Sequence, residues 1–195
     1  MPVFPTSRVA AVVTAALFLT LAACARDDSP PVSPALQDEE IPVYTFSVDP
    51  SLLQEEEILP GGIALRVPRG WIVQEPGSPL FQQFQPAGAE GFELDLLALS
   101  DEGAAMIAGT YREDVSPEAV ASRVTEDPGS RDHFRHEGLE FHQARVMTEE
   151  AVLFVLATAT PAGTVMIQFV LATEAVQEQT MRQVESAIGS IRPLN

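Results

Sequence analysis

Three histidines lie close together in the chain and are the side chains best suited to chemistry. They are His133, His136 and His142, with acidic residues between and beside them. Imidazole and carboxylate groups together can bind zinc or copper. The spacing favours another interpretation, because no two of these histidines stand four residues apart, as they would on one face of a helix. Arg131 and Arg135 also place positive charge near any bound ion. We therefore expect a solvated polar turn without a metal, and for His142 a position on the face of a strand.

Other catalytic patterns are absent from the sequence. It contains no G-x-S-x-G motif and no lysine, so the hydrolase nucleophile elbow, the P-loop lysine and Schiff-base chemistry are excluded. The acidic runs Glu55-Glu56-Glu57 and Glu149-Glu150 are expected to be solvated, because adjacent side chains point in different directions. We expect a protein that is not an enzyme and has no cofactor. The alternative is a small metal-binding carrier or hydrolase centred on His133, His136 and His142.

The one cysteine, Cys24, ends a segment that is organised like a secretory signal peptide. Arg8 supplies a positive charge, and the apolar run Val9–Leu21 that follows is shorter than the ~20 residues needed to span a bilayer. Leu21-Ala22-Ala23-Cys24 resembles the lipobox of bacterial lipoproteins, in which the cysteine sulfur receives a diacylglycerol and becomes the first residue. The resemblance implies an acylated protein that carries chains such as palmitate.

The same resemblance implies a location and a type of partner. The mature protein would be exported and anchored by lipid to the cell membrane or an outer membrane, facing the periplasm or the exterior. Ala25, after the cysteine, resembles lipoproteins that are sorted to an outer membrane. The expected partners are the membrane, reached through the N-terminal lipid, and an unidentified protein of the cell envelope. The formal net charge of −17 disfavours nucleic acid, which is bound through cationic contacts to phosphate.

The composition divides the chain into three parts. Residues 1–23 are the expected signal peptide, residues 24–42 the acylated cysteine and an acidic, proline-rich tether, and residues 43–195 a single globular domain. With no thiol other than Cys24, this domain folds without a disulfide.

Hydrophobic periodicity predicts mostly strands within the domain. The runs 151–159 and 164–172 are apolar almost throughout, which predicts central strands covered on both faces. In 92–99 we expect one inward face formed by Phe92, Leu94, Leu96 and Ala98. Residues 104–112 fit neither the helical pattern nor the strand pattern clearly enough for a prediction. Strands are expected at 43–48, 63–67, 71–74, 80–85, 92–99, 139–147, 151–159 and 164–172, and helices at 51–59, 116–126 and 174–188.

Two segments carry a resemblance to one family. Val67-Pro68-Arg69-Gly70-Trp71 resembles the V-P-x-G-W motif of the PsbP-like superfamily, and Val184–Ile191 resembles the helix that ends its domains. This superfamily includes an extrinsic protein of photosystem II, a Ran-binding import factor and bacterial lipoproteins. The resemblance implies an α+β fold, with an antiparallel β-sheet flanked by helices, and no active site. Within the motif, Pro68 and Gly70 would form a turn and Trp71 would bury its indole.

Overall fold

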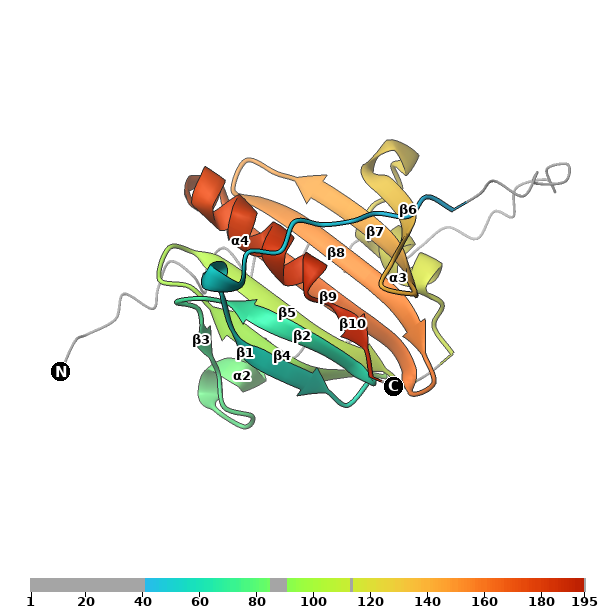
Figure 1. Ribbon diagram of the computed structural model, residues 1–195, viewed down its shortest axis with the longest axis horizontal. Coiled ribbons are helices and arrows are strands. Elements are labelled where there is room, and N and C mark those ends of the chain that lie inside the picture. Colours follow the sequence, from blue (N-terminus) through green and yellow to red (C-terminus); the bar gives the residue numbers. More distant parts are fainter. Residues whose placement is uncertain (1–40, 85–90, 113, 195) are drawn as a thin grey trace, which may run out of the picture.

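A seven-stranded antiparallel sheet lies at the centre of the computed structural model, which describes residues 41–84, 91–112 and 114–194 (Figure 1). The predicted signal peptide, the lipobox with Cys24 and most of the tether lie outside these residues. In order across the sheet, the strands are β3 (Ile72–Val73), β4 (Phe92–Leu99), β5 (Ala104–Tyr111), β9 (Gly163–Ala172), β8 (Ala151–Thr160), β7 (Leu139–Met147) and β6 (Arg131–His136).

Other elements cover both faces of this sheet. On the face that Figure 1 shows in front, here called the front face, lie helix α4 (Glu178–Gly189) and a small sheet of β1 (Leu53–Leu59), β2 (Ile63–Pro68) and β10 (Arg192–Pro193). On the opposite back face lie α2 (Pro79–Gln83) and α3 (Pro117–Val124). Short 3-10 turns are η1 (Pro50–Leu52), η2 (Pro128–Ser130) and η3 (Thr173–Ala175). This arrangement confirms the expected α+β class.

Two apolar clusters join the layers. The front cluster contains Trp71, Phe134 and Phe141 together with residues of α4 and the small sheet. The back cluster contains Phe81 of α2 and Val120 of α3 together with the other face of the strands. Strands β8 and β9 contribute side chains to both clusters, which confirms that their apolar runs lie in the middle of the sheet.

Residues 104–111, within the stretch for which no element was predicted, form the fully buried strand β5. Several other predictions are confirmed. Ser116 caps α3 by accepting a hydrogen bond from the Ala119 N–H, with Pro117 at the first helical position. The predicted segments that correspond to observed elements are 63–67, 71–74, 92–99, 116–126, 139–147, 151–159, 164–172 and 174–188.

The predicted helix at 51–59 is wrong. Asp49 caps only the short turn η1, and the chain continues as β1, which pairs antiparallel with β2. Glutamate and leucine favour a helix locally, but pairing within a sheet overrides this preference. The acidic run lies on an edge strand, where Glu56 forms an ion pair with Arg192.

The predicted strand at 80–85 is also wrong, as far as the structure describes it. Residues 79–83 form α2, in which the Ser78 hydroxyl accepts a hydrogen bond from the Phe81 N–H and Pro79 occupies the first position. Ser78-Pro79 is the same helix-start signal as Ser116-Pro117, which predicted α3 correctly. Strand β6 was not predicted at all.

A bulge in β4 changes the predicted inward face. Pairing with β5 shifts between Leu94 and Leu96, with Asp95 at the irregularity. Leu94 therefore belongs to the back cluster, whereas Leu96 and Ala98 belong to the front cluster. The prediction of one common inward face is wrong, because the extra residue reverses the alternation.

Residues 41–49, here called the N-terminal segment, bond to the open edge of β6 at Pro42 and Tyr44 and then cross the front face to α4 (Figure 1). The predicted strand at 43–48 is reduced to one parallel bridge, between Val43 and Arg135. The Arg135 N–H donates to the Pro42 carbonyl, and the Tyr44 N–H donates to the Arg135 carbonyl, both at 2.8 Å. In the described part of the chain, no helix has the length and hydropathy required to cross a membrane.

Candidate functional site

The β6–β7 hairpin determines where the three histidines lie. Its two turn residues, Glu137 and Gly138, have φ values of 49° and 80°, the left-handed conformation typical of a tight hairpin turn. In the resulting register His133 lies directly opposite His142. Because side chains alternate between the faces of a strand, His133 and His142 share the back face and His136 lies on the front face.

The back face of the hairpin brings together two imidazoles and a carboxylate. We call His133, Glu140 and His142 the His–Glu cluster. The two imidazole rings stack with centroids 4.2 Å apart and planes 15° apart, and His133 Nε2 lies 2.9 Å from Glu140 Oε1. One potential ligand atom from each residue lies within 4.8 Å of the other two. Neighbouring strands therefore supply three groups that converge on one point.

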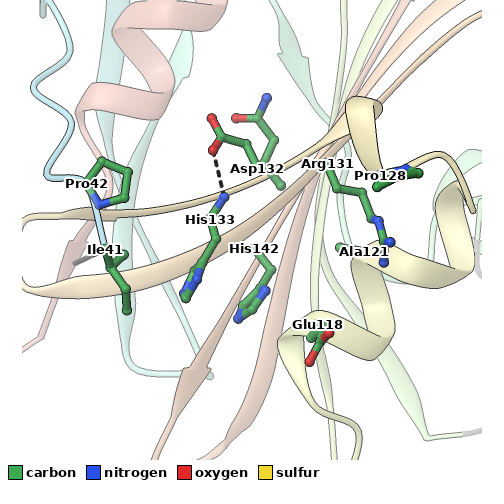
Figure 2. A pocket seen from close by; sticks show the side chains of 10 residues that line it. Ile41, Pro42, Glu118, Ala121, Pro128, Arg131, Asp132, His133 and His142 are labelled. Atoms are coloured by element: carbon green, nitrogen blue, oxygen red, sulfur yellow. Dashed lines mark hydrogen bonds between the residues drawn. The ribbon is translucent and has the colours of Figure 1, made fainter. Parts of the chain in front are cut away.

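An open hollow of about 460 Å³ lies between α3 and the hairpin, beside this cluster. Figure 2 shows the two imidazoles side by side, with Glu118 of α3 on the far side of His142 in this view. The start of the N-terminal segment also borders the hollow. The lining residues are Ile41, Pro42, Glu118, Ala121, Pro128, Arg131, Asp132, His133, His142 and Gln143.

Two pKa shifts determine the charge of the cluster. Burial lowers the pKa of His142, and the neighbouring His133 acts in the same direction, while Glu118 and Glu140 oppose this shift. The hydrogen bond from His133 lowers the pKa of Glu140, with a further contribution from Arg135. Near neutral pH the cluster therefore presents a neutral His142 and an ionised Glu140, the protonation states in which these side chains bind cations.

The predicted polar turn is wrong for His133 and His136, because both lie on strand β6, and His136 does not belong to the cluster. It is only 5% exposed, and its ring lies edge-on to Phe46 with centroids 5.0 Å apart. Its Nδ1 lies 3.1 Å from the Tyr44 carbonyl oxygen, and its Nε2 lies 3.2 Å from that of Gly189. His136 therefore connects the N-terminal segment to the end of α4. The alternative site of three histidines is corrected to two histidines and Glu140.

Sequence reasoning missed the pairing of His133 with His142 because it sought helical spacing. The available signal was Gly138 between two alternating segments, since glycine favours a tight turn. For His142, the predicted position on the face of a strand is confirmed.

The Pro-x-Gly-Trp segment has the structural role that we predicted. Gly70 has φ 87°, and the Trp71 N–H donates to the Pro68 carbonyl at 3.2 Å, which closes the turn. The Trp71 side chain is 4% exposed within the front cluster. The Gln54 amide donates to the carbonyls of both Pro68 and Trp71, which ties the turn to β1.

Comparisons with known proteins find similar chains among the solved structures. No protein-family model matches the chain, and no curated protein matches it. A crystal structure from Bacteroides thetaiotaomicron VPI-5482 is similar, with a TM-score of 0.47 and 14% sequence identity. The match covers 72% of this chain and 48% of the other, so the chain spans about half the length of that protein.

Proposed function

We propose that this protein is a lipid-anchored component of a bacterial cell envelope, with one domain that acts as a non-catalytic binding or assembly module. The observation that carries the proposal is Leu21-Ala22-Ala23-Cys24 at the end of an apolar run too short to span a bilayer. A cysteine that carries two or more acyl chains attaches stably to a membrane, whereas a single chain binds only marginally. The unidentified envelope partner would bind the domain.

The position of the N-terminal segment is consistent with such an anchor. Pro42 and Tyr44 are hydrogen-bonded to β6, so the chain joins the domain at one edge of the central sheet. The proline-rich residues before this point would extend by ~3.1 Å each and separate the domain from the membrane. The acidic surface would also keep the domain away from anionic lipid head groups.

The non-catalytic role is supported by the chemistry of the side chains. The sequence has no lysine and only one thiol, which the proposed acylation blocks. Among the hydrogen bonds of the described residues, the histidine rings meet a carboxylate and two backbone carbonyls, and no hydroxyl nucleophile. A place in the PsbP-like superfamily is part of the proposal, and the buried Trp71 after a Pro-x-Gly turn supports it.

Labelling in cells tests the anchor. We expect the parent chain to incorporate labelled palmitate and to have Cys24 as its mature N-terminus. Cys24→Ser should incorporate no label and remain uncleaved before position 24, because the acylated sulfur is missing. Ser33→Ala, in the tether, is the matched control and should behave like the parent. A parent chain that takes up no label, or a mature chain that begins elsewhere, contradicts the proposal.

A further inference from the structure

We propose that His133, Glu140 and His142 bind a divalent transition-metal ion of the zinc type. This inference goes beyond the proposed function and does not depend on the lipid anchor. It rests on the convergence of three ligand atoms from two adjacent strands, at the side of an open hollow. The sequence argued against a metal because of spacing and positive charge, and the structure removes both objections.

The distances suit one ion after small side-chain movements. Two ligands that each lie ~2.1 Å from one zinc ion are at most ~4.2 Å apart. The ligand atoms of the cluster lie within 4.8 Å of one another, so rotation of half-exposed side chains closes the difference without moving the backbone. The hairpin register fixes the backbone of His133 opposite that of His142. This arrangement limits the conformational entropy that is lost when the ion binds.

The nearby arginines do not block the ion. Arg131 directs its guanidinium to α3, where Nη1 donates to the Ser122 hydroxyl at 2.7 Å. Arg135 lies 3.3 Å from Glu140 Oε2, while the other oxygen, Oε1, faces His133. Arg135 can therefore hold one carboxylate oxygen while the other coordinates the ion. Ligating carboxylates are commonly oriented by such an outer hydrogen bond.

The charge around the cluster also suits a cation. Glu118 borders the same hollow, and its negative charge acts on His142.

The type of ion follows from the ligand atoms. Two imidazole nitrogens with one carboxylate suit zinc and its neighbours such as copper, whereas magnesium and calcium prefer oxygen alone. Three protein ligands on one side leave a coordination position toward the hollow.

Calorimetric titration with zinc tests this site. The sample is the full chain with Cys24→Ser, freed of metal in detergent, so that no thiol competes. We expect one zinc ion per chain and no comparable binding of magnesium. His133→Ala with His142→Ala should abolish zinc binding over the range of the titration, and Glu140→Gln should weaken it. Circular dichroism checks that each variant is folded.

Two control variants distinguish the loss of a proposed ligand from the general effect of removing a carboxylate or a histidine. Glu93→Gln removes a carboxylate that is also on a strand, half-exposed and paired with an arginine, Arg112, and it should bind zinc like the parent. His136→Gln removes the histidine of the other face and should retain zinc binding when folded. The proposal is overturned if the parent binds no zinc at micromolar concentration. It is equally overturned if the double histidine variant binds like the parent, or if Glu93→Gln loses as much affinity as Glu140→Gln.

Discussion

On its front face the β6–β7 hairpin presents Phe134, His136 and Phe141 to the interior, and on its back face it presents His133 and His142 to an open hollow. The histidines at 133 and 136 are three residues apart on one strand. Alternation nevertheless places one beside a carboxylate and the other beneath the N-terminal segment. Their environments, and hence their roles, follow from the register of the hairpin and not from proximity in the sequence.

The front face contributes mainly to stability. Phe134 is fully buried and stacks with Phe141 at 5.5 Å and with Tyr44 at 4.8 Å between ring centroids. Aromatic pairs at such distances add to the free energy gained from apolar burial. The back face of the hairpin is only partly covered. Its ion pairs are half-exposed, so they contribute little to stability. The two faces should therefore respond very differently to mutation.

Phe134→Ala is expected to have the largest effect. Removing a fully buried phenyl ring typically lowers the free energy of unfolding by ~3–5 kcal/mol, and Phe134 also supports Tyr44 and Phe46 of the N-terminal segment. Urea denaturation of parent and variant measures this loss. A change below ~1 kcal/mol would mean that the front cluster does not depend on this ring.

His136→Ala should lower the free energy of unfolding by about 2 kcal/mol, because it removes a buried ring that packs edge-on against Phe46 and its contacts to the Tyr44 and Gly189 carbonyls. Hydrogen exchange at the Tyr44 and Arg135 amides should also become faster, since the segment that they hold loses its contact to α4. Denaturation and exchange mass spectrometry check both effects. If His136 lay in a solvated polar turn, as the sequence suggested, the variant would lose about 0.5 kcal/mol or less in free energy of unfolding. Its amide hydrogen exchange would then be unchanged.

His142→Gln is expected to reduce the pH dependence of stability. Because the pKa of His142 is lowered in the folded state, the unfolded chain binds its proton more readily. The parent should therefore be more stable above the ordinary histidine value of 6.5 and lose stability as the pH falls through the lowered pKa of His142. Unfolding free energies measured across this range should be flatter for the variant. Parallel curves for the two proteins would contradict the assignment.

His133→Ala should have the smallest effect on stability, within ~0.5 kcal/mol, because the side chain is half-exposed and its partner Glu140 remains solvated. Urea denaturation of the metal-free protein is the measurement. A loss as large as that expected for His136→Ala would remove the contrast between the two faces.

The parts of the fold that were predictable from the sequence are those where one local signal dominates. The apolar runs of β8 and β9 required burial on both faces, and Ser116-Pro117 marked the start of α3. Strand β6 was missed because only Phe134 and His136 face the interior, which leaves a short and mostly polar segment. The residues of β1 favour a helix on their own and form a strand only because β2 lies beside them.

The candidate site was only partly predictable, because its geometry depends on the pairing of two strands. The sequence drew attention to three histidines, but which of them meet depends on the register of β6 against β7. A shift of one residue would exchange the faces of every side chain on the strand. The role of Glu140 depends on that pairing as well, since it contacts His133 across the two strands.

Histidine footprinting tests the contrast between the two faces most directly. Diethyl pyrocarbonate modifies accessible neutral imidazoles, and mass spectrometry measures the rate at each residue. We predict that His133 and His142 react in the native protein, that zinc protects both, and that His136 reacts only after denaturation. If His136 reacts in the native protein as fast as His133, the assignment of buried and exposed histidines is contradicted.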